Sequence, residues 1–441
     1  MRYAICGVSN RGLASFALPL LGASAGEDTV LGYGRNDEDH SAHGTLVAAL
    51  DSDEQRAQDF VALLQEADPS VKAPVVYTDI DALIAEAKPD ALIVATPDDT
   101  HEQYVLAGLK AGLRVIVEKP MTSTAAAAAR VLEAERRSDG GVLVTHNLRY
   151  TARHRLIKQL LLEGAVGRVV QVNLQYFVDV RHGASYFLRW NRQRMRSGGL
   201  SVHKSTHHID LVNWWLGAEP EYVVADGGRA YYGPDSPHRP LGDDGRPLVG
   251  RALRERDPYF QAQRGSGAFP DDADEARTGL FGLSYHEQYP AGHDEYLYDD
   301  VIDIEDHFSA LIGYPGATLS YNINFSSPWE GYRLVIAGTH GQLETSTGRT
   351  VSGEAMPGTD QVIVRPLFDE ARVVPIEHVR GGHEGADPLL RRDLFEGVTP
   401  ESEALGMVAS SREGAVAVAA GEALWRSIIE RRIVTIEELL P

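Results

Sequence analysis

The stretch RYAICGVSNRG, residues 2–12, runs from a short apolar segment directly into a turn bounded by two glycines. Apolar sequence typical of a helix follows in LASFALPLLG, residues 13–22. A strand, a glycine-rich turn and a helix in this order place backbone N–H groups and a helix N-terminus against a pyrophosphate. The turn reads G-x-S-x-x-G, with a small serine where the dinucleotide-binding pattern prefers glycine. It predicts cofactor contacts at Gly7, Ser9, Asn10, Arg11 and Gly12.

A second predicted strand, TLVAAL at residues 45–50, is followed by Asp51. A carboxylate there can accept hydrogen bonds from both ribose hydroxyls, which favours NAD and disfavours the extra phosphate of NADP. Asp51 follows Gly12 by 39 residues, whereas the usual spacing is about 20. We interpret the polar stretch 22–44 as an inserted surface loop that accounts for the excess. The alternative is that Asp51 caps the next helix.

Strand and helix patterns alternate up to about residue 148. Four further predicted strands end in the sequences VVYTD (75–79), ALIVATP (91–97), RVIVEKP (114–120) and GVLVTHN (141–147). This alternation predicts a parallel, doubly wound sheet of the Rossmann type. ATP at 95–97 and EKP at 118–120 fall at the carboxyl ends of strands, the edge where ligands bind in open α/β sheets.

Composition narrows the class of protein. The 441 residues are too many for one compact core, so we expect two domains. The net charge of -21 disfavours nucleic acid and anionic membranes as partners. The single cysteine, Cys6, excludes an intrachain disulfide and is expected to be a small buried hydrophobe. We find no apolar run of about 18 residues and no secretory signal, and expect a cytoplasmic protein.

These motifs resemble the Gfo/Idh/MocA family of NAD(P)-dependent sugar oxidoreductases. The resemblance covers most of the chain except about 227–300, and EKP followed by an H-x-x-D helix after a double glycine is its most specific part. The matching stretches are GVSNRG (7–12), ATPDDTH (95–101), VEKPMTST (117–124), HNLRY (146–150), SGGLSVHKSTHHIDLVNWWLG (197–217), SALIGYPGATLSYNINF (309–325) and GYRLVIAGTHGQLET (331–345).

The resemblance implies an NAD-binding Rossmann domain over 1–148 and a second domain over 149–441. The second domain is expected to hold a large, mostly antiparallel sheet that closes over the nicotinamide. Alternating strand patterns from residue 168 onward agree with this. A helix over about 403–429 is expected to pack back on the first domain. By resemblance alone, we expect a homo-oligomer, either a dimer or a tetramer.

An insertion over about 226–300 is rich in Gly, Pro, Asp and Arg. Three interpretations remain open for it: a solvated surface segment, a cover over the substrate, or a contact with a neighbouring subunit.

The stretch GGLSVHKSTHHID, residues 198–210, carries the family's G-G-x-x-x-D-x-x-x-H-x-x-D pattern with one departure. His203 stands at the usual aspartate, His207 at the catalytic histidine and Asp210 at the last acidic position. With Lys119 of EKP, these residues are implied to surround a substrate hydroxyl. Oxidation of an alcohol needs a base near the O–H and a cation for the developing alkoxide. We assign His207 as the base and Lys119 as the stabilising partner.

His203 cannot orient Lys119 by charge as a carboxylate does, although it can relay a proton. Two histidines at positions i and i+4 can also bind zinc. We disfavour a metal because no glutamate lies between them and NAD supplies the electrophile. The other alternative is that the histidines cap or pack the start of a helix. His208, one turn after Lys204, can contact substrate or bond to the backbone or a second layer of side chains.

Further contacts are expected at the strand ends and in an arginine-rich segment. SYFLRWNRQRMRSGG, residues 185–199, can stack an aromatic ring on a sugar and hold an anionic group with arginine. A solvated loop with salt bridges is the equally weighted alternative. Expected cofactor contacts also include Thr96, Pro97, His101, Glu118, Lys119 and Asn147. Expected substrate contacts are Arg149, Tyr150, Trp190, Arg192, Lys204, His208 and Asp210.

Three functions are consistent with these residues. The preferred one is NAD-dependent dehydrogenation of a sugar, sugar acid or polyol. The alternative is an NAD-dependent glycosidase that oxidises C3 transiently, eliminates the aglycone, adds water and returns the hydride, acting for example on an anionic sulfoquinovoside. The Y-P-T-H-G motif of the related N-acetylgalactosaminidases is absent. A non-catalytic NAD-binding regulator is disfavoured because it would not need both Lys119 and His207.

Overall fold

A computed structural model of the chain describes residues 1–22, 38–67, 69, 71–263, 277–279, 282–289, 295–358, 360–377 and 382–441. Most of the stretch 22–44, interpreted above as a surface loop, lies outside these residues. The chain forms two compact units. Unit 1 comprises Met1–Ala152, Asp272–His293 and His378–Ala415, and unit 2 comprises Arg153–Asp271, Asp294–Glu377 and Val416–Pro441. Two late segments of the chain therefore join the N-terminal unit, whereas the sequence predicts a simple boundary near residue 148.

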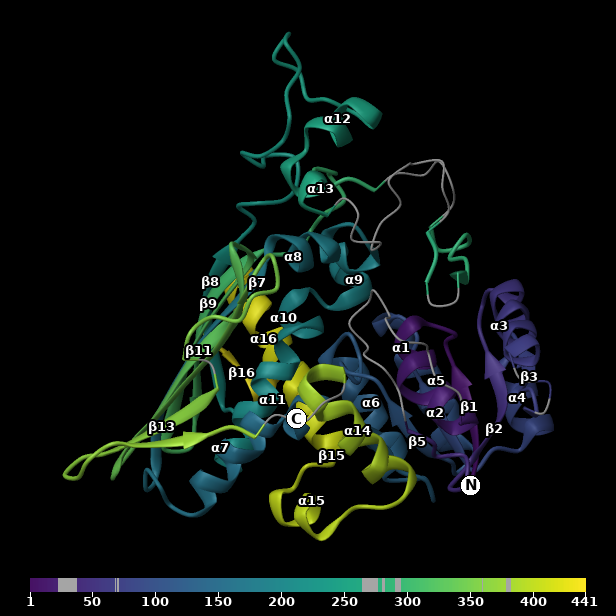
Figure 1. The fold of residues 1–441 in the computed structure, drawn as a ribbon, viewed down its shortest axis with the longest axis horizontal. Helices are drawn as coiled ribbons and strands as arrows, with labels where there is room; N and C mark the ends of the chain where they lie inside the picture. Colours follow the sequence, from purple (N-terminus) through teal and green to yellow (C-terminus); the bar gives the residue numbers. More distant parts are fainter. Residues whose placement is uncertain are drawn as a thin grey trace. The chain divides into compact units, whose positions relative to one another are not determined.

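The predicted doubly wound sheet is confirmed in unit 1 (Figure 1). Its seven strands follow the order β15-β6-β5-β4-β1-β2-β3, and the first six strands along the chain are parallel. The order reverses between β1 and β4, and ligands of doubly wound sheets bind at such a switch point. The strands are β1 (Arg2–Cys6), β2 (Thr45–Leu50), β3 (Val75–Tyr77), β4 (Ala91–Val94), β5 (Arg114–Val117), β6 (Val142–Val144) and the antiparallel β15 (Ala409–Ser410).

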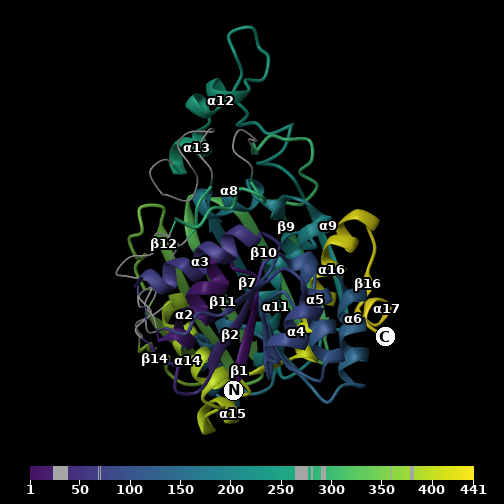
Figure 2. The same ribbon diagram turned by 90° about the vertical axis from the view of Figure 1, so that its right-hand side faces the viewer.

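Burial on both faces explains why these strands read as unbroken apolar runs. All four residues of β4 are buried, and Cys6 in β1 is fully buried. Helices flank the sheet, as the views in Figures 1 and 2 show. Asp79 and Thr124 cap two of the helices through their side chains, as sequences of this kind predict. The helices are α3 (Glu54–Ala67), α4 (Ile80–Ala87), α5 (His101–Lys110) and α6 (Ala125–Glu135).

Unit 2 contains the predicted large, mostly antiparallel sheet. The nine strands follow the order β14-β13-β12-β11-β7-β10-β9-β8-β16, and only β7 and β10 pair in parallel. Their bounds are β7 (Val169–Asp179), β8 (Tyr222–Gly228), β9 (His307–Tyr314), β10 (Ala317–Ser327), β11 (Trp329–Gly338), β12 (Gly341–Thr350), β13 (Gln361–Pro366), β14 (Arg372–Pro375) and β16 (Val434–Thr435).

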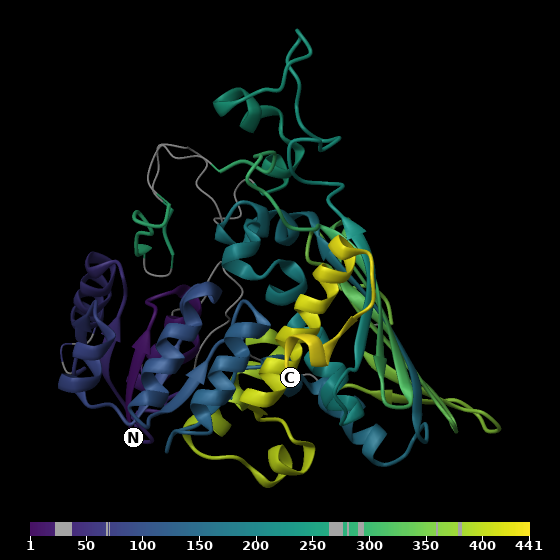
Figure 3. The ribbon, with the colours of Figure 1, turned by 180° about the vertical axis from the view of Figure 1, so that it is seen from behind.

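One face of this sheet is packed against helices. Every second residue of β10, from Ala317 to Ser327, is buried, and the residues between are half-buried. A period of two is what a strand with one covered face produces. Figures 1 and 3 show helices lying along the covered face. They are α7 (Ala152–Leu162), α10 (Leu200–His203), α11 (Ser205–Leu216) and α16 (Ser411–Glu430).

The prediction of a single helix over about 403–429 is wrong, because two helices and a short strand occupy this part of the chain. Helix α15 (Pro400–Leu405) ends at Gly406, which has a φ of 63°. The backbone N–H of Gly406 donates to the last carbonyl oxygens of the helix. Strand β15 then pairs with β6 in unit 1, and α16 starts at Ser411. A glycine in the left-handed region stops the helix, although the residues on both sides favour helix.

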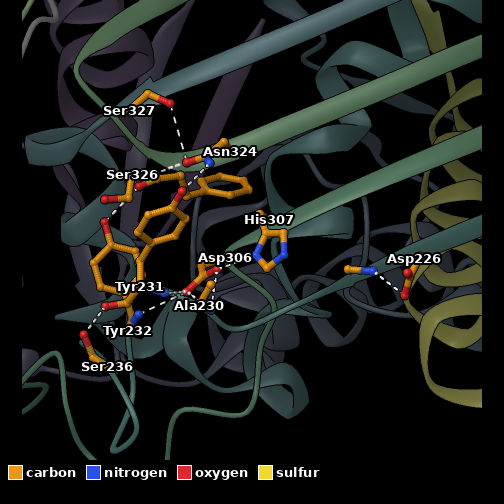
Figure 4. Close-up of polar contacts among 12 residues, drawn as sticks. Asp226, Ala230, Tyr231, Tyr232, Ser236, Asp306, His307, Asn324, Ser326 and Ser327 are labelled. Carbon is orange, nitrogen blue, oxygen red and sulfur yellow. Dashed lines mark hydrogen bonds and ion pairs between the residues drawn. The ribbon is translucent and has the colours of Figure 1, made fainter. Parts of the chain in front are cut away.

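A buried carboxylate just after the insertion binds the backbone at its start in unit 2 (Figure 4). Asp306 is 0% exposed and accepts hydrogen bonds from the backbone N–H groups of Ala230, Tyr231 and Tyr232 at 3.0, 2.7 and 3.0 Å. The Nδ1 atom of His307 lies 2.9 Å from the same carboxylate. These contacts fix the chain where it leaves β8. Beyond them lie α12 (Gly250–Arg256) and α13 (Pro258–Gln263), with α13 next to α8 (Val180–Phe187) in Figures 1 and 2.

Asp306→Ala is expected to lower the free energy of unfolding by about 3 kcal/mol or more, because it leaves several buried N–H groups without an acceptor. Urea unfolding followed by tryptophan fluorescence measures the change. The matched control is Asp226→Ala, at an exposed position on neighbouring β8, where about 0.5 kcal/mol or less is expected. Equal losses in the two variants would show that the contacts at Asp306 do not stabilise the unit.

Candidate active site

The glycine-rich turn of unit 1 is built by close backbone approach. Gly7 has a φ of 98°, and a Cβ there would lie 2.6 Å from the carbonyl oxygen of Ala95. A Cβ at Gly12 would lie 2.6 Å from the carbonyl oxygen of Gly7. Ser9 caps the following helix by accepting from the N–H of Gly12 at 3.1 Å, and it donates to Ala95 at 2.8 Å. The serine therefore ties the turn to the end of β4 while the glycines keep the turn tight.

Asp51 lies beside this turn. Its Oδ2 accepts the N–H of Val8 at 2.8 Å, and its Oδ1 accepts the guanidinium of Arg56 at 3.0 Å. Asp53, not Asp51, caps helix α3, because its side chain accepts the N–H of Arg56 at 3.0 Å. The helix-cap alternative for Asp51 is therefore wrong. Sequence reasoning missed Arg56, whose only signal is a basic residue one turn after a capping aspartate.

The carboxyl ends of β4 and β5 are joined by His101. Its Nδ1 lies 2.9 Å from the carbonyl oxygen of Pro120, and its Nε2 lies 2.8 Å from that of Thr96. A neutral imidazole has one N–H, so both contacts are full hydrogen bonds only when the ring is protonated. The side chain is 1% exposed. His101 therefore holds the ATP and EKP segments together. The peptide bond between Lys119 and Pro120 in the EKP segment is cis.

Asp98 is a buried acid at this edge that the motif analysis did not single out. It is 4% exposed, and burial raises its pKa to about 8, while His101 and Lys119 act in the opposite direction. Asp98 therefore holds its proton more readily than an exposed aspartate does. Lys119 itself is half-buried, and its backbone N–H donates to the side chain of Glu118 at 3.3 Å.

A buried network joins Arg11, Glu118 and Asn147, which the sequence places in three separate motifs. Arg11 forms ion pairs with Glu118 at 2.8 Å and with Asp387 at 2.9 Å, and Asn147 donates to Asp387 at 3.0 Å. Burial lowers the pKa of Arg11, but the two carboxylates outweigh it and hold that pKa above its usual value. Asp387 comes from α14 (Gly382–Phe395). Nothing local in the sequence indicates its role.

Arg149 and Tyr150, expected to contact substrate, lie in the interior of unit 1. Arg149 is fully buried, donates to the carbonyl oxygen of Gly406 at 3.2 Å and forms an ion pair with Glu413 at 2.8 Å. Tyr150 is 1% exposed. These contacts favour a structural role, in which Arg149 holds the segment that carries β15.

In unit 2 the double glycine turns the chain into the histidine-rich helices. Gly198 and Gly199 have φ values of 71° and 80°, a conformation that favours glycine. The helical run is interrupted at Lys204, which separates α10 from α11. His203 is half-buried, and its Nε2 lies 3.2 Å from the side-chain nitrogen of Asn191. Since the amide nitrogen can only donate, this Nε2 accepts.

The residues on α11 are more deeply buried. His207 is 8% exposed, and Asp210 is 1% exposed. His208 is 2% exposed, lies 2.7 Å from the hydroxyl of Tyr321 and stacks on Tyr176 with ring centroids 4.1 Å apart. These contacts hold His208 against the sheet, which fits the second-layer alternative better than a substrate contact.

Lys204 lies at the junction of the two helices. It is half-buried, and its ammonium lies 5.4 Å from the ring centroid of Tyr176. Burial lowers the pKa of Lys204, whereas the charge of Glu330 raises it and that of Arg349 lowers it. The net shift is downward, so this amine gives up its proton more readily than an exposed lysine.

The arginine-rich segment forms salt bridges, as one of its two interpretations predicts. Arg192 is 7% exposed and binds Asp299 at 2.8 Å, and Arg194 binds Glu305 at 2.8 Å. Their partners come from the end of the insertion and the approach to β9. Trp190 is half-buried and meets the ring of His203 edge-on at 5.6 Å. Trp190 therefore packs against His203, whereas the guanidinium groups of Arg192 and Arg194 are paired with carboxylates.

The residues of unit 1 fit a dinucleotide. A tight turn that admits no Cβ at Gly7 or Gly12 leads into a helical run over residues 10–21, and Asp51 stands at the end of β2. Such a turn binds pyrophosphate, and such a carboxylate binds ribose. Lys119 belongs to unit 1, while His203, Lys204 and His207 belong to unit 2.

A known protein matches almost the whole length of the chain, and another matches part of it. The protein YteT of Bacillus subtilis (strain 168), named as an oxidoreductase, is 41% identical over 440 residues, which span 98% of this chain and 97% of that protein. Inositol 2-dehydrogenase 2 of Saccharopolyspora erythraea is 33% identical over 200 residues, which span 43% of this chain and 53% of that protein.

In the described part of the chain, no helix has the length and apolar content needed to cross a membrane.

Solved structures share the fold. Levoglucosan dehydrogenase, in a complex with NADH and L-sorbose, gives a TM-score of 0.63 at 17% identity. The match covers 100% of this chain and 100% of that chain. The WlbA dehydrogenase of Bordetella pertussis, in a complex with NADH and UDP-GlcNAcA, gives 0.60 at 17% identity, with 98% of each chain covered.

Family models match both parts of the chain. Residues 1–146 match the NAD-binding Rossmann fold of an oxidoreductase family, and residues 158–436 match the C-terminal alpha/beta domain of the same family. Unit 1 therefore carries the NAD-binding domain of this family. The chain belongs to the Gfo/Idh/MocA family of oxidoreductases.

Proposed function

We propose that this protein oxidises a hydroxyl group of a sugar or sugar derivative, and that Lys119 and His207 handle the hydroxyl proton. The relative from Saccharopolyspora erythraea is named an inositol 2-dehydrogenase, which supports a polyhydroxylated substrate. When bound, NAD supplies the acceptor for the hydride. The chain's own residues then have to bind the hydroxyl, take its proton and stabilise the oxygen as charge develops on it.

The observation that carries this proposal is the presence of two motifs in one chain. The EKP motif stands at the carboxyl end of β5, where the network of Arg11, Asp387 and Glu118 fixes the residue next to Lys119. The double glycine opens α10 and leads to His203 and His207. A site with both an amine and an imidazole suits alcohol oxidation, because one cation stabilises the alkoxide while the other group accepts the proton.

Lys204 and His203 extend the same proposal. His203 accepts from Asn191 through Nε2, so it is a neutral ring in this arrangement and can pass a proton through its other nitrogen. Lys204, whose pKa is lowered by burial, can bind substrate oxygens and gives up its proton more readily than an exposed lysine. We assign Trp190, which adjoins His203, to the substrate's ring face.

The first test is a two-wavelength assay. Purified protein is mixed with NAD and a panel of neutral and anionic sugars, polyols and nitrophenyl glycosides, and the absorbance of NADH and of nitrophenolate is followed together. The proposal expects NADH to accumulate in step with substrate consumption. Nitrophenolate release that requires NAD but leaves no NADH would overturn it in favour of glycoside cleavage by transient oxidation. Neither signal on the whole panel would favour a regulator.

Lys119→Met and His207→Ala are each expected to lower kcat by at least about 100-fold, since each removes a group that moves or stabilises the hydroxyl proton. In His207→Ala, binding of NAD, measured by calorimetry, should change by less than about threefold, because this substitution alters none of the expected cofactor contacts. The matched control is His340→Ala, at an exposed turn position of unit 2, which should retain activity. Full activity in both test variants would refute the assigned roles.

Asp51→Ala is expected to weaken NAD binding by about 10-fold to 100-fold, the usual cost of losing hydrogen bonds to a charged group. It also frees Arg56 from its ion pair, so the ratio of NADP to NAD affinity should rise. Calorimetric titration with both nucleotides measures the two effects. Asp81→Ala, at an exposed position of α4, serves as the control. An unchanged ratio would remove Asp51 from the ribose site.

A further inference from the structure

A short part of the insertion belongs to unit 1, although it lies far from the Rossmann motifs in sequence. We name residues 277–279 and 282–289 the capping segment. Thr278 pairs with Ser284, the N–H of Gly279 donates to Leu283 at 2.8 Å, and the N–H of Tyr285 donates to Arg277 at 2.9 Å. Leu283 is 5% exposed. The capping segment is thus a folded turn with a buried side chain, which is unusual for a solvated loop.

The capping segment contacts the glycine-rich turn through Tyr285. The hydroxyl of Tyr285 accepts the backbone N–H of Asn10 at 3.1 Å and donates to the side-chain oxygen of Asn10 at 3.1 Å. Gly279 lies equally close, since a Cβ there would be 2.2 Å from that side-chain oxygen. Asn10 is the first residue of the helical run over 10–21, and its N–H is one of the donors that such a terminus offers to a pyrophosphate.

The same tyrosine also contacts the ribose end of the site. The guanidinium of Arg56 lies 4.5 Å from the centroid of the Tyr285 ring, and Arg56 binds Asp51 at 3.0 Å. The next residue, His286, lies 3.5 Å from the carboxylate of Asp53, which is 1% exposed. One side chain therefore adjoins both the first N–H of the helical run and the arginine that binds Asp51.

We infer that Tyr285 is a cofactor-binding residue and that the capping segment forms the outer wall of the site for the ADP half of NAD. When the phenol of Tyr285 turns its O–H away from the Asn10 side chain, it can donate to a phosphate or ribose oxygen. Its ring lies over Arg56, the partner of Asp51. A wall supplied by the same chain slows release of the nucleotide, because the wall has to detach first. Stacking also keeps Arg56 on Asp51, which disfavours binding of a 2′-phosphate.

The test measures binding rather than turnover. The full-length protein, Tyr285→Phe and Tyr285→Ala are titrated with NAD, ADP-ribose and nicotinamide mononucleotide, and the dissociation rate of NAD is measured by stopped flow. Tyr285→Phe should weaken NAD and ADP-ribose by about 3-fold to 10-fold, the usual effect of one lost hydrogen bond. Tyr285→Ala should weaken both further and speed dissociation, because the ring is lost as well. Affinity for nicotinamide mononucleotide should stay constant.

The matched control is Tyr222→Phe on β8 of unit 2, where the ring lies against Gly313. This variant removes a phenol hydroxyl in the other unit and should bind NAD as the wild type does. Unchanged affinity in both Tyr285 variants would overturn the inference. Tighter NAD binding would also overturn it, since that result means that Tyr285 competes with the nucleotide for Asn10. Because no substrate is present, these outcomes do not depend on the proposed function.

Discussion

The buried ion pair between Arg11 and Asp387 is the contact on which the cofactor side of the molecule depends. It joins the glycine-rich turn to α14, and the same guanidinium reaches Glu118. Removing charges from water is costly, and a buried pair is stable only when further hydrogen bonds satisfy its remaining atoms. Here Asn147 supplies one of them. Lys119 follows Glu118 directly in the chain, so the position of the lysine is set by a network that performs no chemistry itself.

Local pattern explains why the fold of unit 1 is predictable. Buried strands followed by amphipathic helices, with glycine at the first turn, determine a doubly wound sheet within short stretches of sequence. The same holds for Asp51, which needs only to follow β2. Asp387 is different, because it lies 240 residues beyond Asn147 and no spacing rule relates them. Tyr285 escaped notice for the same reason, since its contact with Asn10 joins segments 275 residues apart.

The histidine-rich stretch shows the limit of reading a helix from spacing alone. On one continuous helix, His203 and His207 would lie on one face, and Lys204 and His208 on the next. The interruption at Lys204 changes these directions. His203 meets Trp190 and Asn191, whereas His208 stacks on Tyr176. The motif predicts which types of residue lie here, but it does not predict their neighbours. The interruption between α10 and α11 depends on packing with other parts of the chain.

The insertion leaves and re-enters unit 2 at adjacent points. Asp306 binds the backbone of residues 230–232, and the N–H of Gly233 donates to Leu297 at 2.6 Å. When the two ends of a loop are already tied, a change in its length costs little chain entropy. The stability of the sheet in unit 2 therefore depends little on how many residues lie between these ends. The insertion can therefore vary in length between its tied ends, whereas its capping segment is constrained in sequence by the contacts of Tyr285 with Asn10 and Arg56.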